Sequence, residues 1–266
     1  MPLHIEVTGQ GPPLVLLHGW ALNLRVFDAL VEALRPQLTL HAVDLPGHGR
    51  SAGPLATAGA VNEQILDELI ERLLSQLPAQ FLLCGWSLGG QLAMAIAKRA
   101  PQRLCKLVLV ATTPRFTATT DWPHGVQANV LERLVAQLAE DYRGTVTGLL
   151  ELQVRGSQHA AQVLQTLQHA LFEHGAASPD ALRTGLEWLG SIDLRACLGV
   201  ITAPTLVIAG QYDRVTPPSA GRWIASQLRA GQFHEFARAG HAPFLSHPRQ
   251  FSELIRQFLL AGTVAA

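Results

Sequence analysis

The hydrophobic pattern in the first part of the chain alternates between short apolar runs and longer amphipathic stretches. Leu, Val and other apolar residues form nearly continuous runs at 13–17, 39–44, 80–84 and 106–111. Between these runs, residues 25–34 and 61–77 carry apolar positions three and four apart, which predicts helices. Buried apolar strands that alternate with helices are typical of a parallel sheet covered on both faces. The sequence therefore predicts an α/β fold with a mostly parallel central sheet.

The alternation of short apolar runs and amphipathic stretches stops in the middle of the chain. From 112 to 190 the spacing of Leu and Ala is helical and no strand pattern stands out, whereas strand patterns return at 205–209 and, weakly, at 232–236. A final helix is expected over 248–260. We therefore predict an α/β core formed by residues 1–111 and 191–266, with a helical cap formed by residues 112–190. The cap is expected over the carboxyl edge of the sheet, where open α/β sheets bind ligands.

Composition and charge narrow the class of protein. The 266 residues are 48% hydrophobic and 15% charged, which is typical of a globular protein with a large core. Twenty basic and twenty acidic residues cancel, so no overall field attracts nucleic acid or an anionic membrane. No basic residue precedes Arg25 and the first apolar run is short, so we expect no secretory signal and no transmembrane span.

The cysteines and histidines do not form a metal-binding pattern. Cys84, Cys105 and Cys197 are widely spaced and lie in or beside apolar stretches, which predicts buried free thiols in a reducing cytoplasm. No CxxC or HExxH spacing occurs, and the eleven histidines are scattered. We therefore expect neither a metal nor an organic cofactor.

The segment Gly85-Trp86-Ser87-Leu88-Gly89 carries the strongest chemical signal. It reads G-x-S-x-G, it follows an apolar run, and the helix-like residues 90–97 come after it. Strand, tight turn and helix form the context in which this pattern indicates a nucleophile elbow. A glycine-rich turn that matches the pattern by chance is the alternative interpretation. In the elbow interpretation, Ser87 is the nucleophile.

A serine nucleophile needs a base and an acid that orients the base, and in this class of fold both follow the serine in the chain. Asp213 comes after a buried strand and a short polar loop, although an aspartate there could also cap a turn. His241 lies in a loop shaped by a preceding glycine and a following proline, which favours it over His234 in a strand and His247 at a helix start. We predict Asp213 and His241 as the acid and the base.

Acyl transfer also needs hydrogen-bond donors for the oxyanion. The backbone amide of Leu88, directly after the nucleophile, is the expected first donor, and the amide of Trp20 is the expected second. His18 is better explained as a residue that stabilises this loop than as a ligand or a base. The segment 44–51, DLPGHGRS, lacks the lysine of a phosphate-binding loop and is interpreted as a connection that supports the site.

These motifs together resemble the α/β-hydrolase superfamily along the whole chain. HGW, DLPGHGRS, GWSLGG, GQYD and GHAPFLSHP occur in the order that the superfamily shows. The resemblance extends to one family, BioH, the carboxylesterases of biotin synthesis. It rests on the segments Leu17–Trp20, Gly85–Gly90, Asp121–Pro123, Gly185–Glu187, Asp193–Arg195, His241–Phe244 and Ser246–Pro248.

The resemblance implies a function and a substrate site. It implies that the methyl ester of pimeloyl-[acyl-carrier protein] is hydrolysed to methanol and the free pimeloyl carboxylate, so the acyl-carrier protein is the expected partner of a monomeric enzyme. The residues that the resemblance places around the substrate are Trp20, Ser87, Leu88, His241 and the cap run Leu149, Leu150, Glu151, Leu152 and Gln153. From its pattern alone, this run of leucines is more typical of a helix core.

The chain departs from the family pattern where the family binds its acidic carrier protein through arginines. The corresponding positions here are Gly144, Gly148, Ala161 and Gln165, with Arg143 and Arg155 nearby as possible replacements. Two other functions use the same fold and stay open on the residues alone. One is a general carboxylesterase for short-chain acyl esters, and the other is a non-catalytic protein that binds a small ligand.

Overall fold

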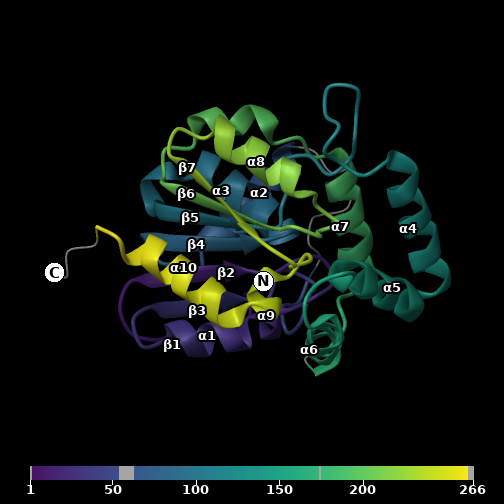
Figure 1. Ribbon diagram of the computed structural model, residues 1–266, viewed down its shortest axis with the longest axis horizontal. Helices are drawn as coiled ribbons and strands as arrows, with labels where there is room; N and C mark the ends of the chain where they lie inside the picture. The colour runs from purple at the N-terminus through teal and green to yellow at the C-terminus, as the bar shows by residue number, and fades with distance from the viewer. Residues whose placement is uncertain (1, 54–62, 174, 263–266) are drawn as a thin grey trace.

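The computed structural model describes residues 2–53, 63–173 and 175–262 and contains a seven-stranded sheet (Figure 1). The strands are β1 (Ile5–Gly9), β2 (Pro13–Leu17), β3 (Thr39–Val43), β4 (Phe81–Trp86), β5 (Leu104–Val110), β6 (Thr205–Gly210) and β7 (Gly231–Phe236). Their order across the sheet is β1-β3-β2-β4-β5-β6-β7. Only the pairing of β1 with β3 is antiparallel among these strands. The predicted α/β fold with a mostly parallel sheet is confirmed.

The central strands form where the apolar runs are continuous. All six residues of β4 and all six of β6 are buried, because helices cover both faces of the sheet there. The sequence did not predict β1. Its side chains are partly exposed at the edge of the sheet, and a short edge strand next to the N-terminus has no continuous apolar run to mark it.

Helices cover both faces of this sheet (Figure 1). Helix α1 (Asp28–Leu34) follows the 3₁₀ turn η1 (Leu24–Phe27) and packs against α10 (Pro248–Leu260) on one face. The other face carries α2 (Glu63–Leu74), α3 (Leu88–Arg99) and α8 (Pro218–Gln227). The remaining short elements are η2 (Pro101–Arg103), η3 (Arg195–Val200) and α9 (Pro243–Ser246). Residues 61 and 62 of the predicted second helix lie outside the described residues.

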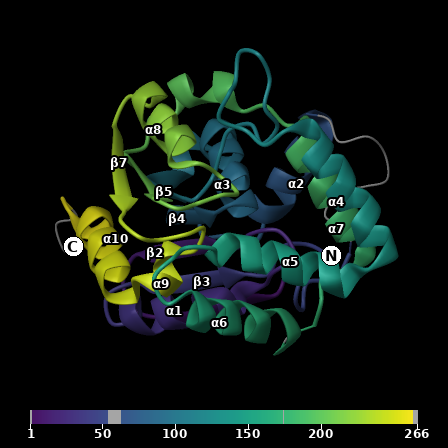
Figure 2. The ribbon, with the colours of Figure 1, turned by 45° about the vertical axis from the view of Figure 1, so that its right-hand side comes forward.

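In the described part of the chain, four α-helices stand between β5 and β6. They are α4 (Ala128–Glu140), α5 (Tyr142–Val154), α6 (Ala160–Glu173) and α7 (Pro179–Ser191). Figures 1 and 2 show them gathered at one end of the sheet, in front of the strand ends. The assignment of residues 112–190 to a cap and of 1–111 and 191–266 to the core stays a prediction.

The helical pattern expected from residue 112 begins later in the structure. Residues 112–127 form an irregular loop that is closed by isolated bridges, and the first helix begins at Ala128. Pro114 and Pro123 explain the difference, because proline cannot donate the helical hydrogen bond and disfavours the helical conformation of the residue before it. The expectation of helix over this first part was therefore wrong.

Hydrogen bonds fix the helices between β5 and β6 to the loop after β2. The Asn23 side-chain amide donates to the carbonyl of Ala170 in α6 at 2.6 Å, and the Trp20 indole donates to the carbonyl of Leu182 in α7 at 2.9 Å. Both donors are buried. The two helices are thereby held at a fixed place relative to the strand ends.

One prediction about the cysteines is wrong. Cys84 and Cys197 are buried free thiols, and burial raises the pKa of Cys84 to about 12 and that of Cys197 to about 11. Cys105 is exposed instead, because it is the second residue of β5 and its side chain faces away from the core at the start of the strand. An apolar neighbourhood in the sequence did not reveal which side of the strand it occupies.

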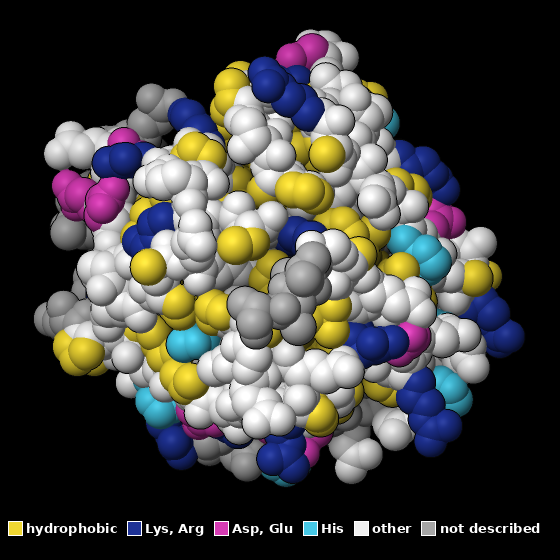
Figure 3. All heavy atoms as spheres, turned by 90° about the vertical axis from the view of Figure 1, so that its left-hand side faces the viewer, with side chains coloured by type: hydrophobic (Ala, Val, Ile, Leu, Met, Phe, Trp, Pro, Cys, Tyr) yellow, Lys and Arg dark blue, Asp and Glu magenta, His cyan; other side chains and the backbone are white. Residues whose placement is uncertain are grey.

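The face opposite to α4 and α5 shows the balanced charge of the chain. In Figure 3, Lys and Arg side chains are spread around this face and Asp or Glu side chains lie beside several of them. Within the described residues, no helix is both long and apolar enough to cross a membrane.

Candidate active site

Ser87 lies in the tight turn between β4 and α3. Its φ of 55° is positive, which is a strained conformation for a residue other than glycine. A Cβ at Gly85 would overlap the carbonyl oxygen of Gly89, and one at Gly89 would overlap that of Leu17, so both flanking positions need glycine. The backbone amide of Ser87 donates to the carbonyl of Val110 at 3.0 Å, which ties the turn to the sheet. The turn thus has the geometry of a nucleophile elbow.

The structure brings Ser87, His241 and Asp213 into one chain of hydrogen bonds. His241 Nε2 lies 2.9 Å from Ser87 Oγ, and His241 Nδ1 lies 2.8 Å from Asp213 Oδ2. The His241 and Asp213 side chains are fully buried. His234 is exposed in β7, and the partly buried His247 contacts Ser246. Of the three histidines considered from the sequence, His241 is the one placed against the serine.

Besides His241, three other donors bind the Asp213 carboxylate. Its Oδ1 accepts the backbone amides of Val215 at 2.8 Å and Thr216 at 2.9 Å, and its Oδ2 also accepts the Thr216 hydroxyl at 2.8 Å. An ionised carboxylate satisfies all of these donors because it only accepts hydrogen bonds. Sequence reasoning missed Thr216. The sequence feature that could have identified Thr216 is its position three residues after an aspartate in a turn.

The loop that carries His241 is fixed from two sides. The Trp86 indole at the end of β4 donates to the His241 carbonyl at 2.8 Å, and the His241 amide donates to the carbonyl of Gln153 in α5 at 2.9 Å. The ring of Phe244 packs edge-on against Trp86, with the ring centres 5.1 Å apart. The imidazole position therefore depends on β4 and α5 as well as on its own loop.

The loop after β2 lies against the nucleophile. A Cβ at Gly19 would come within 3.2 Å of the Ser87 Cβ, so this backbone approaches the serine closely. Neither the Trp20 amide nor the Leu88 amide donates to another group within the described part of the chain. Two backbone donors beside a serine hydroxyl could bind an oxyanion. Their roles as the oxyanion hole stay a prediction.

His18 holds the loop after β2 in place through hydrogen bonds of both ring nitrogens. Its Nε2 accepts the Leu45 amide at 3.0 Å, which leaves Nδ1 to donate to the Gly19 carbonyl at 2.8 Å. This arrangement needs the neutral imidazole, and burial lowers the pKa of His18 to about 4. Asp44 binds the same region, because its carboxylate accepts the amides of Leu24 and Arg50, both at 2.8 Å. The supporting roles predicted for His18 and for 44–51 are confirmed.

The buried histidine makes the stability of the fold depend on pH. The pKa of His18 is about 4 in the folded chain and near 6.5 when exposed, so between these values the unfolded chain binds a proton that the folded chain does not. The contribution of His18 to the free energy of unfolding is therefore fully present above pH 6.5. The free energy of unfolding is expected to fall by roughly 3 kcal/mol as the pH drops to 4. His48, whose pKa burial lowers to about 3, acts in the same direction.

Urea unfolding at several pH values between 7 and 4 measures this effect. His18→Gln should flatten the slope, whereas His159→Gln, a change at an exposed position, should leave it as in the original chain. Parallel slopes for all three proteins would contradict the role assigned to His18.

A small cavity lies at Ser87. Its volume is about 30 Å³, which is close to that of one water molecule. The residues that line it are Gly19, Trp20, Trp86, Ser87, Phe116, Leu134, Leu149, Gln153, Leu186, Leu189 and Val215. Several of these apolar residues come from loop and helix positions that sequence reasoning did not single out. Side chains must move before an ester fills this cavity.

The five residues of the run 149–153 in α5 lie in different environments. Leu149 and Gln153 line the cavity at Ser87, Leu150 is buried between helices, Glu151 is exposed and Leu152 faces an outer groove. Residues four apart share a helix face, which is why Leu149 and Gln153 both face Ser87. The role of the whole run in binding the substrate stays a prediction. Gln153 is buried and its Oε1 has no hydrogen-bond partner within the described residues, which leaves an acceptor free at the cavity.

No cluster of three or more His, Cys, Asp or Glu side chains that could hold a metal occurs among the described residues. The chemistry that the arrangement itself offers is nucleophilic attack by a serine hydroxyl with a histidine as the base.

Comparisons with known proteins agree with this geometry. Residues 12–248 match the family described as alpha/beta hydrolase fold. The chain is 43% identical over 249 residues to a pimeloyl-[acyl-carrier protein] methyl ester esterase of Nitrosomonas europaea, which covers 94% of this chain and 96% of the relative. It is also 43% identical to the protein of the same name from Stenotrophomonas maltophilia, over 97% of this chain and 96% of the relative.

Solved structures share the fold. An esterase from Exiguobacterium antarcticum superposes with a TM-score of 0.85 at 24% identity, covering 97% of this chain and 95% of its own. A hydrolase from Pseudomonas aeruginosa PA01 superposes with a TM-score of 0.77 at 26% identity, covering 97% of this chain and 94% of its own.

Proposed function

The chain belongs to the α/β-hydrolase fold family and, within it, to the pimeloyl-[acyl-carrier protein] methyl ester esterases, and we propose that it hydrolyses the methyl ester of pimeloyl-[acyl-carrier protein] in biotin synthesis. It is a carboxylic ester hydrolase. The products of the proposed reaction are methanol and pimeloyl-[acyl-carrier protein] with a free carboxylate.

The first half of the reaction forms an acyl-enzyme. Ser87 Oγ attacks the ester carbonyl while His241 Nε2, 2.9 Å away, takes the hydroxyl proton. Asp213 accepts a hydrogen bond from His241 Nδ1–H throughout and stabilises the imidazolium that forms. The carbon–oxygen bond to the methoxy group then breaks, and His241 returns the proton so that methanol leaves. The acyl group stays bound to Ser87 Oγ.

The second half repeats these steps with water. His241 takes a proton from a water molecule as the water attacks the acyl-enzyme carbonyl, and then gives this proton to Ser87 Oγ as the ester bond to the serine breaks. The pimeloyl carboxylate is released on its carrier. In both halves the negative charge on the carbonyl oxygen is bound by the amides of Trp20 and Leu88.

One observation carries the chemical part of the proposal: the unbroken hydrogen-bond chain from Ser87 through His241 to a carboxylate that is itself fixed by three further donors. This alignment activates the serine as a nucleophile. A protein that only binds a ligand has no need of an activated serine. The substrate part rests on the two relatives that are 43% identical over nearly the whole chain.

A comparison of two ester substrates tests the substrate. We expect kcat/KM for monomethyl pimeloyl-[acyl-carrier protein] to exceed that for methyl butyrate by at least about 100-fold, because interactions with the distant carrier add to the binding of the transition state. The chain should also restore growth without biotin to a strain that lacks this esterase. A preference for methyl butyrate together with failure to restore growth would instead establish a general short-chain esterase.

A further inference from the structure

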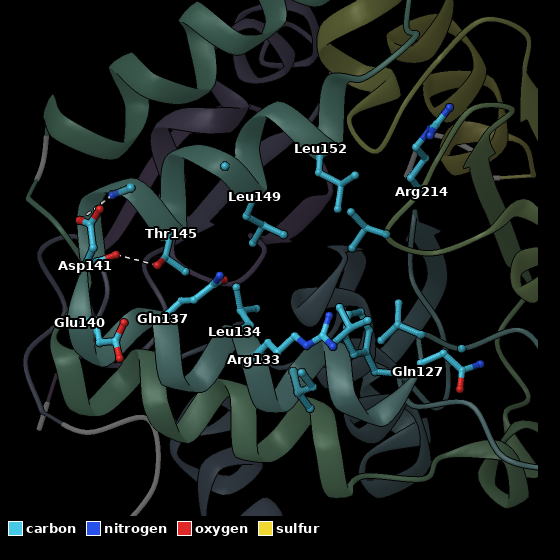
Figure 4. Close-up of a pocket in the computed structure, with 18 residues that line it drawn as sticks. Gln127, Arg133, Leu134, Gln137, Glu140, Asp141, Thr145, Leu149, Leu152 and Arg214 are labelled. Atoms are coloured by element: carbon cyan, nitrogen blue, oxygen red, sulfur yellow. Dashed lines mark hydrogen bonds between the residues drawn. The ribbon is translucent and has the colours of Figure 1, made fainter.

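A groove of about 900 Å³ lies between α4 and α5, outside the cavity at Ser87. Four residues line both spaces, namely Phe116, Leu134, Leu149 and Val215. They form the boundary through which a long substrate would pass from the groove to the serine. Figure 4 shows Leu134, Leu149 and Leu152 extending into this space from the two helices. An occupant of the groove would therefore have an apolar surface beside it and Ser87 beyond the boundary.

Two arginines from different elements line this groove. Arg133 belongs to α4, and Arg214 directly follows Asp213 in the loop after β6 (Figure 4). Both side chains are exposed, and neither has a hydrogen-bond or ion-pair partner in the stretches that the structure describes. Most other arginines are engaged, as in the pairs of Arg115 with Asp193 and of Arg183 with Glu187. Arg133 and Arg214 can therefore bind an external anion without breaking an internal contact.

Acidic residues lie at the opposite end of the groove. Glu140 and Asp141 line it near the turn between α4 and α5, and Asp141 also accepts the Gly144 amide at 2.9 Å (Figure 4). Arg133 and Glu140 are seven residues apart on one helix, which corresponds to about 10 Å. The groove is thus positive at one end and negative at the other. An acidic partner would be attracted to the end with Arg133 and Arg214 and repelled from the other.

Glycines keep the wall formed by α5 open. Gly144 and Gly148 both line the groove, and a Cβ at Gly148 would meet nothing within 4 Å. These are two of the positions where arginines would be expected from the resemblance to the family. Arg143 and Arg155, the nearby replacements suggested by the sequence, do not line the groove. The charges that face the groove therefore come from α4 and from the core loop.

We propose that the acyl-carrier protein docks over this groove with its acidic surface against Arg133 and Arg214, while its pantetheine arm lies along Gly148 and Leu149 and delivers the ester to Ser87. This inference rests on the proposed function. It places the docking cations of this chain on α4 and on the loop after β6, in place of the α5 positions that carry them in the family. Neither arginine nor Gly148 lines the cavity at Ser87, so a short ester needs none of the three.

Charge-removing variants test the docking cations. Arg133→Gln and Arg214→Gln should each raise KM for monomethyl pimeloyl-[acyl-carrier protein] about fivefold, and the double variant about 20-fold or more, with little change in kcat. Turnover of methyl butyrate should stay within about twofold. Arg249→Gln removes an exposed arginine of α10 and serves as the matched control. Added salt should raise KM in the original chain more than in the double variant.

The arms of this experiment separate the possible failures. If the original chain does not turn over the carrier-bound ester but hydrolyses methyl butyrate, the proposed function fails. If it turns over both esters and the double variant keeps the original KM for the carrier-bound ester, the docking proposal is overturned. The docking proposal is likewise overturned if Arg143→Gln with Arg155→Gln raises this KM and the double variant does not.

A second pair of variants tests the position of the arm. Gly148→Trp would fill the groove beside Leu149, and Gly148→Ala adds only a methyl group to the same open space. We expect the Trp variant to lower kcat/KM at least about tenfold for both monomethyl pimeloyl-[acyl-carrier protein] and monomethyl pimeloyl-pantetheine, which lacks the carrier. The Ala variant, which adds far less volume, should lower kcat/KM by less than the Trp variant does. Unchanged turnover of both substrates by a folded Trp variant would contradict the assigned path.

Discussion

Ser87→Ala is expected to lower kcat for any ester substrate by a factor on the order of 10⁵–10⁶. The loss is this large because the hydroxyl forms the covalent intermediate, and without it His241 and Asp213 have no nucleophile to activate. Residual hydrolysis would come only from binding and from oxyanion stabilisation. The measurement is steady-state release of methanol, together with the mass of the chain after treatment with a fluorophosphonate, which should add one phosphonyl group to the original chain and none to the variant.

The control for this prediction is the folded state of the variant. Alanine removes one oxygen at a position whose backbone is fixed by Val110 and Thr112, so the free energy of unfolding should change by less than about 1 kcal/mol. Ser246→Ala is the matched control, because this serine is buried near the His241 loop but lies outside the hydrogen-bond chain. Ser246→Ala should keep kcat within about twofold. A Ser87→Ala variant with more than a few per cent of the original kcat would refute the role of Ser87.

The sequence predicted the parts of the site that depend on local structure. Gly85 and Gly89 are needed because neighbouring backbone approaches them closely, and such a requirement leaves a mark in the sequence itself. Asp213 and His241 were found because each follows a strand of a parallel sheet, and the carboxyl ends of such strands meet at one edge. Three residues far apart in the chain could therefore be assigned to one place.

The boundary of the cavity could not be predicted in this way. Phe116 lies in an irregular loop and Leu134 on a helix whose apolar residues also pack against other helices, so neither position has a pattern that distinguishes a cavity from a core. Helical geometry also divided the run 149–153, which the resemblance had treated as one unit. Only the packing of α4 and α5 against the core decides which side of each helix faces Ser87.

Asp213→Asn is expected to lower kcat about 10⁴-fold, the size of effect known for the equivalent change in serine proteases. The Asn oxygen will occupy the position of Oδ1, because two backbone amides, those of Val215 and Thr216, donate to it there. The Asn NH₂ group then occupies the position of Oδ2 and faces His241 Nδ1. Two donors cannot face each other, so the imidazole must carry its proton on Nε2.

This tautomer prevents catalysis, because a protonated Nε2 cannot accept the proton of Ser87 at 2.9 Å. The proton NMR signal of His241 Nδ1–H should therefore be absent in Asp213→Asn and present in the original chain. Asp180→Asn, which removes a carboxylate that pairs with Arg183 at the surface, should leave both kcat and this signal unchanged. If Asp213→Asn kept more than a tenth of the original kcat, the carboxylate would be a structural group that is dispensable for orienting His241, and another residue would have to fix the tautomer.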